Sequence, residues 1–399
     1  MLKFFANPSN IYIALWCVYL LQGTLYPVGG VLSQSSLVLA ILMSLWHVFK
    51  ILSIPNKRPL FFRGLALLVL MYTIYGLVLF YTDGSHTQGL VLHPQTSNYL
   101  KGYYMSLLPF FSCYYFANKG YLTSKQLRRW VVVFVIVAVA EYYRMEREAL
   151  ESMFKSEGEV VNNAGYIMLS IIPCMLIFKK RLFQYIILII CLLFILFSVK
   201  RGAIMIGGVL VLFQLYHTLR EMKGKQRLFF ILGVVVVACV LIWYLRDTLF
   251  ESRLFLERVE STKEGNSSGR EDLFSTMINF YLNDATIIQQ LIGVGADGTL
   301  KVASNYAHND WLELLINQGL LGVFIFAFYW FCLYRTSISK NLSILSRRVL
   351  LMALIYTFLL SLFSMSIGEL NIYVASIMGF ALADGFRRDG YYSISDDTK

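Results

Sequence analysis

Long apolar runs constrain this chain more than any other feature of its sequence. Twelve stretches are apolar over a length close to the roughly 17–25 residues that a helix needs to cross a bilayer. Because backbone groups inside a bilayer must find their hydrogen bonds within the protein, these stretches predict an all-α integral membrane protein with about 12 transmembrane helices. The expected spans are residues 11–29, 32–49, 64–82, 99–117, 129–143 (a short run), 162–178, 182–199, 201–219, 228–245, 311–334, 349–366 and 369–385.

The composition of the chain agrees with this class. Of its 399 residues 57% are hydrophobic and 15% are charged, whereas soluble domains carry about 25% charged residues. The first apolar run has no small-residue cleavage site in front of a polar domain, so we expect it to be retained as a helix. All six cysteines fall inside the runs at spacings unlike those of metal ligands, and we expect them to be packing residues.

The basic residues predict the orientation of the chain. With the N-terminus inside, most of the 35 basic residues fall in loops on one side, such as "LREMKGKQR", and the positive-inside rule makes that side cytoplasmic. The net charge of +11 is then a topology signal, and no nucleic-acid partner is expected. We expect spans one to nine in residues 1–246, a periplasmic loop with an amphipathic helix in 247–310, and spans ten to twelve with a cytoplasmic tail in 311–399.

A few basic residues lie at the opposite, outer ends of spans. Lys200 and Arg201 occupy the tight connection "FSVKRGAIMIG" with no acid nearby in the sequence, and Gly202 leaves room beside Arg201. Lys101, in "NYLKGYYMSLLPF", starts the fourth span. A basic side chain can snorkel to the interface from such a position, but ionisable groups at this depth usually face a polar cavity or a ligand. We therefore treat all three as candidate contacts to an anionic substrate, with Arg201 the strongest.

The stretch "SSGREDLFSTMINFY" has the pattern of a helix start, in which Ser268 and Glu271 form a capping box. Apolar residues then recur at helical spacing: Leu273, Met277 and Phe280 or Tyr281. The pattern predicts an amphipathic helix on the outer membrane surface. Arg270 lies in its first turn, where the helix dipole and the free N–H groups favour an anion, and a bound phosphate would compensate for the unfavourable charge.

The stretch "YAHNDWLELLINQGLLG" places His308 at the end of the outer loop, just before the tenth span. A histidine titrates near neutrality and can accept a proton from a hydroxyl group. Asn309 and Glu313 are one helical turn apart and can hydrogen-bond to a substrate or to each other. Gly319 and Gly322 lie on one helix face and allow close helix packing. These observations make His308 a candidate general base.

The stretch "GVGADG" contains Gly293, Gly295 and Gly298 in the pattern G-x-G-x-x-G. The glycines follow no predicted strand and lie outside the membrane, so a dinucleotide site is not expected. We expect a turn-rich loop that leads to the next helix.

Three stretches occur in a fixed order on the outer side, namely "SVKRGAIMIG", "SGREDLF…LIGVGADG" and "AHNDWLELLINQGLLG". As a set they resemble the O-antigen polymerase and ligase superfamily, the Wzy and WaaL proteins. The resemblance includes the family's H-N-x9-G-x-x-G pattern at His308, Asn309, Gly319 and Gly322, and the stretch "NNAGY" at 162–166. The layout of twelve spans with a large periplasmic loop between spans nine and ten also looks like that family.

The resemblance implies roles for three residues. Arg201 and Arg270 would hold the diphosphate of an undecaprenyl-linked glycan, and His308 would assist attack by an acceptor hydroxyl. The chemistry is sound in itself, because arginine stays protonated and offers planar bidentate donors to a leaving diphosphate. Lys101, Lys200, Asn309 and Glu313 are further candidate substrate contacts. The outer side carries no His–Cys cluster, acidic triad or D-x-D pair, so we expect metal-independent chemistry without a cofactor.

These features predict a polysaccharide polymerase in the bacterial inner membrane, with its site on the periplasmic side. It would add a glycan to a lipid-linked repeat unit of O-antigen, capsule or exopolysaccharide. The closest alternative is a ligase that transfers the glycan to lipid A–core, and a transporter without chemistry is a reading from a different class. The "VKRG" spacing, the aromatic content and the modest loop favour the polymerase. A chain-length regulator is a candidate partner, and the sugar, its linkage and the oligomeric state are left open.

Overall fold

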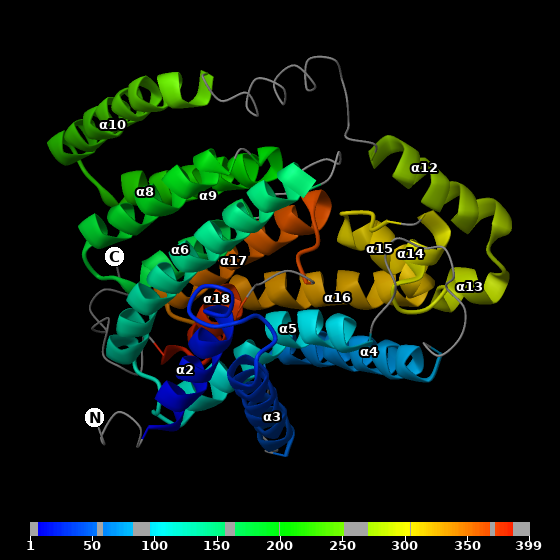
Figure 1. The fold of residues 1–399 in the computed structure, drawn as a ribbon. Coiled ribbons are helices and arrows are strands. Elements are labelled where there is room, and N and C mark those ends of the chain that lie inside the picture. Colours follow the sequence, from blue (N-terminus) through cyan, green and yellow to red (C-terminus); the bar gives the residue numbers. More distant parts are fainter. Residues whose placement is uncertain are drawn as a thin grey trace.

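The computed structural model describes residues 7–53, 59–82, 96–155, 164–198, 200–250, 270–303, 305–367 and 372–385. Regular structure within these ranges is helical, apart from one isolated bridge between Gln22 and Tyr26 (Figure 1). The predicted all-α class is therefore confirmed for the part of the chain that is described.

The helices fall into a bundle and a smaller group built from the outer loop. The bundle contains α2 (Pro8–Leu20), α3 (Val31–Leu52), α4 (Leu60–Thr82), α5 (Thr96–Asn118), α6 (Ser124–Lys155), α7 (Ala164–Ile171) continued by the 3₁₀ turn η1 (Ile172–Ile177), α8 (Arg181–Phe197), α9 (Arg201–Glu221), α10 (Lys225–Phe250), α15 (Asp310–Asn317), α16 (Gly319–Ser337), α17 (Ile344–Phe363) and α18 (Ile372–Leu382). The loop group contains α12 (Arg270–Asn279), the π turn η2 (Phe280–Asp284), α13 (Ile287–Ile292) and α14 (Gly298–Ala303).

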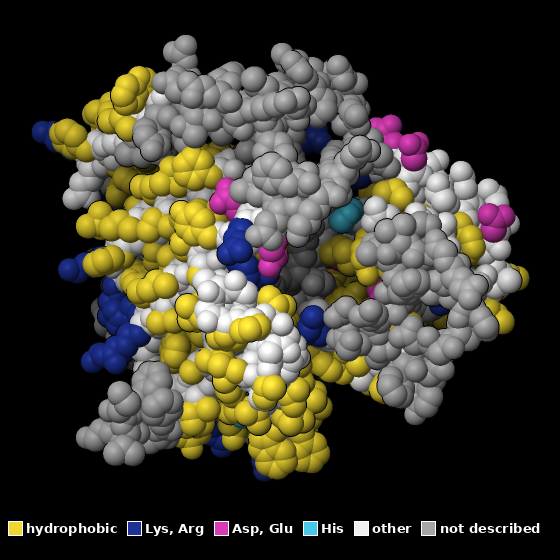
Figure 2. All heavy atoms as spheres, viewed as in Figure 1, with side chains coloured by type: hydrophobic (Ala, Val, Ile, Leu, Met, Phe, Trp, Pro, Cys, Tyr) yellow, Lys and Arg dark blue, Asp and Glu magenta, His cyan; other side chains and the backbone are white. Residues whose placement is uncertain are grey.

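Five of these helices are long and apolar enough to cross a membrane: α3, α4, α9, α16 and α17. Shorter apolar helices follow the same pattern in α2, α7 with η1, α8 and α18. Each apolar run of the sequence contains one of the helices, but the total of about 12 transmembrane helices stays a prediction. Hydrophobic side chains cover much of the face in Figure 2, as expected for helices that contact lipid.

Two apolar runs are interrupted where a continuous helix was expected. The run 11–29 is helical only to Leu20, after which the chain turns at Gly23 with a φ of 76°. The run 311–334 breaks at Gln318, and Gly319 follows with a φ of 65°. Glycine adopts such left-handed angles without the Cβ clash that other residues suffer. The break separates the short helix α15 from the membrane-length helix α16.

The core of the bundle is built by close pairs of helices. The helix α5 packs on α18 and α4 packs on α16. A Cβ atom at Gly379 of α18 would collide with the carbonyl oxygen of Phe110 in α5, so glycine is required for this close approach. Five of the cysteines are buried and act as packing residues, whereas Cys239 of α10 is exposed.

The outer loop packs against α15 through a second, smaller hydrophobic cluster. Its buried members are Met277, Ala307, Leu312 and Ile316. The predicted helix at Arg270 is present, and Met277 on its apolar face is buried in this cluster. The position of the helix at the membrane surface stays a prediction. Ser268 of the predicted capping box lies outside the described residues. The cluster fixes the loop that carries Arg270 onto the helix that follows His308.

Candidate active site

The last turn of α17 is the platform on which the site is assembled (Figure 1). The Nη1 atom of Arg270 donates a hydrogen bond of 3.2 Å to the carbonyl oxygen of Phe363. The Nδ2 atom of Asn309 donates one of 3.1 Å to the carbonyl oxygen of Leu362. These carbonyls end a helix, where they lack helical partners and carry the negative end of the helix dipole. The platform therefore brings two distant sequence motifs together.

The first turn of α15 is fastened to the same region. The Oδ1 atom of Asn309 caps the helix by accepting from the backbone N–H groups of Trp311 at 3.0 Å and Leu312 at 3.1 Å. The next residue, Asp310, is buried and accepts from the backbone N–H of Ser366 at 2.7 Å and from its hydroxyl group. Both contacts fix the start of α15 and thereby position His308, the residue before the cap Asn309.

His308 is half-buried, and its backbone has a φ of 52°, which is uncommon outside glycine. Burial, and then the positive charges of Arg270 and Lys200, lower the pKa of His308 to about 4. The imidazole is therefore neutral at physiological pH and can accept a proton. Two cationic side chains lie within electrostatic reach of it, as a site for an anion requires.

Lys200 and Arg201 begin α9 as its cap and its first residue. The ammonium of Lys200 lies 5.9 Å from the ring centre of Tyr166 in α7. A Cβ atom at Gly202 would lie 2.6 Å from the hydroxyl oxygen of Tyr166 and 3.5 Å from the Cβ of Phe363. The space expected beside Gly202 is therefore filled by Tyr166, and the glycine lets α9 approach α7 and the platform.

The two basic residues at the start of α9 differ in their exposure to solvent. The side chain of Lys200 is half-buried and influences His308, whereas Arg201 is exposed. Tyr166 was not singled out from the sequence, although it belongs to the "NNAGY" stretch. Asn162 and Asn163 of that stretch lie outside the described residues.

Glu313 is buried and holds the loop that precedes His308. Its Oε2 atom accepts from the hydroxyl of Thr299 at 2.7 Å and from Nδ2 of Asn317 at 3.2 Å. Its Oε1 atom accepts from the backbone N–H of Ala307. Burial raises the pKa of Glu313 to about 7, although these donors oppose the rise. Glu313 and Asn309 thus bind groups of the chain itself, and we interpret both as positioning residues for His308.

The glycine-rich loop packs against the break between α15 and α16. The backbone N–H of Val294 donates a hydrogen bond of 2.8 Å to the carbonyl oxygen of Ile316. The backbone N–H of Gly295 donates one of 3.0 Å to the carbonyl oxygen of Asn317. A Cβ atom at Gly319 would lie 2.6 Å from the backbone nitrogen of Gly293. "GVGADG" is therefore a turn-rich loop that leads into α14, as predicted. The first glycine in the second half of the H-N-x9-G-x-x-G pattern, Gly319, serves this backbone contact.

Lys101 lies at the same end of the bundle on a different helix. It is half-buried near the start of α5, two residues after Tyr99. The hydroxyl of Tyr99 accepts a hydrogen bond of 3.0 Å from Nε2 of Gln318, at the break before α16. The role of Lys101 stays a prediction.

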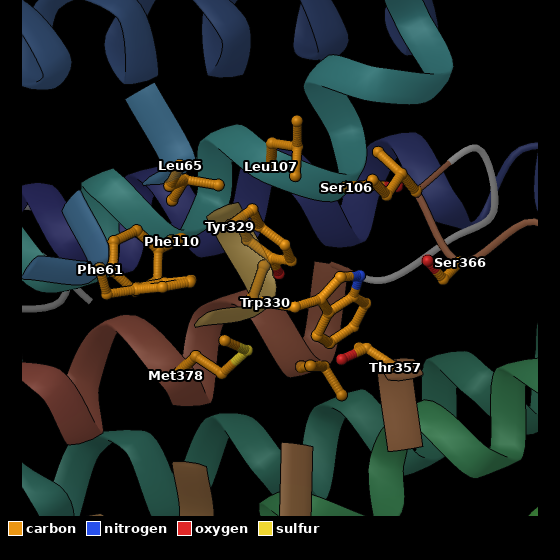
Figure 3. Close-up of a pocket in the computed structure, with 13 residues that line it drawn as sticks. Phe61, Leu65, Ser106, Leu107, Phe110, Tyr329, Trp330, Thr357, Ser366 and Met378 are labelled. Carbon is orange, nitrogen blue, oxygen red and sulfur yellow. The ribbon is translucent and has the colours of Figure 1, made fainter. Parts of the chain in front are cut away.

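A small cavity lies in the bundle behind the platform (Figure 3). It is lined mainly by aromatic and aliphatic residues from α4, α5, α16 and α18, with Ser106, Thr357 and Ser366 as polar members. Its volume of about 30 Å³ holds a water molecule or two but excludes a sugar diphosphate. The buried Nε1 atom of Trp330 at this cavity has no hydrogen-bond partner in the part of the chain that is described, and a water there would satisfy it.

Comparison with known proteins gives one match. Residues 186–327 match the family model described as O-antigen ligase, whereas no curated protein matches the chain. The matched residues include Lys200, Arg201, Arg270 and His308, and they end within α16. The match supports the resemblance to the O-antigen polymerase and ligase superfamily over that part of the chain. The membrane-length apolar helices indicate a multi-pass membrane protein.

Proposed function

We propose, from the similarity of residues 186–327 to the O-antigen ligase family, that this chain is a polymerase of lipid-linked glycans. It transfers a growing glycan from undecaprenyl diphosphate to a lipid-linked repeat unit at the periplasmic face of the inner membrane. The observation that carries the proposal is the grouping of Arg270, Lys200 and a neutral His308 beside the end of α17.

The cationic residues bind the donor and stabilise the leaving group. Arg270 reaches the site from the first turn of α12 and is held by a neutral carbonyl, so its positive charge is kept for an anion. Lys200, the cap of α9, acts on His308 together with Arg270, and Arg201 follows it as the first residue of the helix. Positive donors fixed in this way stabilise the charge that develops on the diphosphate as its bond to the sugar breaks.

His308 removes the proton from the acceptor. The hydroxyl oxygen of the acceptor sugar attacks the anomeric carbon of the donor, and the bond from that carbon to the diphosphate oxygen breaks. The hydroxyl proton passes to a ring nitrogen of His308, and the diphosphate leaves with the bonding electrons. A bound diphosphate raises the pKa of His308 again, because it is a negative charge beside the imidazole. The donor thus makes the ring a stronger base for the acceptor.

The acceptor distinguishes this proposal from its closest alternative, a ligase that transfers the same glycan to lipid A–core. Both use the same donor and the same three motifs. The test incubates purified protein in nanodiscs with lipid-linked repeat units, with and without lipid A–core. A ladder of longer lipid-linked glycans supports the polymerase, a product on lipid A–core alone supports the ligase, and unchanged glycan length with both acceptors contradicts the transferase proposal.

The proposed chemistry uses arginine, lysine and histidine and assigns no step to a metal ion. Activity in the same assay is therefore expected to survive an excess of EDTA. Loss of activity in EDTA that returns with Mg²⁺ would contradict this part of the proposal.

A transporter without chemistry is the remaining alternative. Transporter sites lie near the midplane of the bilayer, between broken helices. The candidate residues here lie at the ends of α9 and α17, which favours a reaction at the membrane surface. A transporter would move the lipid-linked unit across the bilayer of a proteoliposome and leave its length unchanged.

The compartment of the site follows from the orientation that the basic loops predict. Lys223, after α9, and Lys301, in α14, are both exposed and suit single-cysteine labelling in a Cys239→Ser background. Lys301→Cys should react with an impermeant maleimide in cells with a permeabilised outer membrane, and Lys223→Cys should react only after lysis. The reverse pattern would place the site in the cytoplasm and overturn this assignment.

A further inference from the structure

A second cavity, which is polar, lies at the opposite end of the helices α9 and α17 from the candidate site. The start of α8, the end of α9 and the start of α17 surround it, and its volume is about 160 Å³. Its polar lining comes from Lys179, Arg181, Gln184, Gln214, Thr218, Glu221 and Arg348. The cavity is therefore large enough for a small polar group and is built for one.

The charges that line this cavity do not cancel. Arg181 donates to Oε2 of Glu221 at 2.9 Å, and Arg348 donates to Oε1 of the same carboxylate. Among the described lining residues Glu221 is the one acid, and the two arginines Arg181 and Arg348 share its single negative charge. The side chain of Arg348 is only 16% exposed, so its charge is poorly hydrated. An anion in the cavity would balance this excess of positive charge.

Gln214 gives the second, independent indication of a ligand. It is 2% exposed, and its Nε2 atom donates to Oε1 of Gln184 at 3.0 Å. Within the described ranges, its own Oε1 atom is buried and has no hydrogen-bond partner. A buried acceptor without a donor is costly and rare. A group in the cavity that brings a hydrogen-bond donor as well as negative charge would satisfy it.

We propose that this cavity binds a phosphate ester that carries a free hydroxyl group. The phosphate lies against Arg181 and Arg348, and the hydroxyl donates to Oε1 of Gln214. Basic pockets between transmembrane helices on the cytoplasmic side are suited to anionic lipid headgroups. Phosphatidylglycerol has both a phosphodiester and hydroxyl groups, and glycerol phosphate is the soluble source with the same chemistry. The inference rests on the cavity alone and does not depend on the proposed function.

The first test measures lipid binding to the full-length protein by native mass spectrometry in detergent. Wild type should retain phosphatidylglycerol in preference to phosphatidylcholine. Arg181→Gln with Arg348→Gln should bind phosphatidylglycerol about tenfold more weakly, because charged hydrogen bonds are lost. The control, Lys223→Gln with Arg227→Gln, removes the same charge from exposed residues at the same end of the bundle and should bind as wild type does.

Two further variants separate binding from a folding defect. Glu221→Gln removes the competing carboxylate and should bind phosphatidylglycerol more tightly than wild type, which a damaged fold would not do. Gln214→Leu should weaken phosphatidylglycerol but leave phosphatidic acid, which has no headgroup hydroxyl, unchanged.

The source of the phosphate ester is decided by melting temperature in lipid-free detergent. A rise with glycerol phosphate alone assigns the cavity to the soluble ester, and a rise with phosphatidylglycerol alone assigns it to the lipid. Equal retention of phosphatidylglycerol and phosphatidylcholine by wild type, with no response to glycerol phosphate, overturns the proposal. Wild-type binding by the double arginine variant overturns it as well.

Discussion

The two ends of the helices α9 and α17 lie beside arginine side chains, but the partners of these positive charges differ. At the end with the candidate site, Arg270 is bound to the neutral carbonyl of Phe363. At the other end, Arg181 and Arg348 share the carboxylate of Glu221. A carbonyl orients a guanidinium without cancelling its charge, whereas a carboxylate cancels it in part. This difference fits the two proposals, transfer of a highly charged group at the first end and binding of a singly charged one at the second.

The distance between these ends matches a bilayer. The helix α9 contains 21 residues, which corresponds to a length of about 30 Å, close to the thickness of the hydrocarbon core. The basic residues at its two ends therefore suit the two membrane surfaces. Lys and Arg side chains are visible in Figure 2 along the edge near the chain termini, as the positive-inside rule predicts for a cytoplasmic side.

The largest effect should come from removing the charge that the carbonyl platform orients. Arg270→Ala is expected to abolish transfer, because the diphosphate then loses a fixed positive donor both in binding and as it leaves. Arg270→Lys should restore only part of the activity, since a point charge replaces a planar fork. The assay is glycan product per unit of folded protein in nanodiscs. The control is Lys301→Ala, an exposed basic residue of the same loop that should keep full activity. Full activity in Arg270→Ala would remove the distinction drawn between the two ends.

The next largest effect concerns the proton. His308→Ala should lower turnover by roughly 10²–10⁴, the usual contribution of a general base. Donor binding should change little, because it depends on the cationic residues. Affinity for a labelled donor lipid and the rate of transfer are measured separately on the same preparation. A variant that fails to bind the donor but transfers the bound fraction normally would make His308 a binding residue.

A smaller effect on stability tests how the loop is held at the site end. Gly319→Ala places a Cβ 2.6 Å from the backbone nitrogen of Gly293 at a φ of 65°. We expect the free energy of unfolding to fall by about 2 kcal/mol or more, from backbone strain and overlap together. Gly208→Ala is the matched control, because nothing lies within 4 Å of its Cβ position. Melting temperatures in one detergent measure both, and equal values would show that the loop contact contributes little.

The smallest effect is a shift in pH dependence. A protonated His308 cannot accept a proton, so kcat/KM should fall on the acid side near the pKa of about 4 in the free protein. Lys200 is one of the positive charges that lower this pKa, so Lys200→Gln should move the acid limb to higher pH. A lysine that only anchors the helix at the interface would leave the limb in place and change the rate alone. The profile of kcat should lie at higher pH than that of kcat/KM, because the bound diphosphate raises the pKa.

The sequence predicted the helices well and their contacts poorly, for physical reasons. Apolar runs predict helices because a bilayer leaves the backbone no other partners, so α3, α9 and α17 were placed within a few residues. The break at Gln318 was missed, because it depends on the approach of Gly293 from 25 residues earlier in the chain. Local periodicity does not report such a contact.

The candidate site shows the same limit. Arg270 and His308 stood out because their charge and position were unusual for their surroundings. Their shared platform could not be predicted, because Arg270 and Asn309 bind the backbone carbonyl groups of Phe363 and Leu362. Every residue type has a backbone carbonyl, so the amino-acid sequence does not mark these two. The sequence predicts Glu313 as a possible substrate contact, but its carboxylate binds Thr299 and Ala307 instead. These contacts form only when the loop folds back, and local sequence does not report that.

The position of the platform late in the chain has a consequence for biosynthesis. His308 and Arg270 leave the ribosome before Phe363, so the outer loop reaches its compartment while its docking surface is still being made. The loop must wait for α17 to enter the membrane before Arg270 and Asn309 find their carbonyl partners. A chain terminated after α16 would contain every residue of the family match and would still lack the surface on which they meet. We therefore expect the candidate site to form only after the insertion of α17, a helix that carries none of the candidate reactive groups.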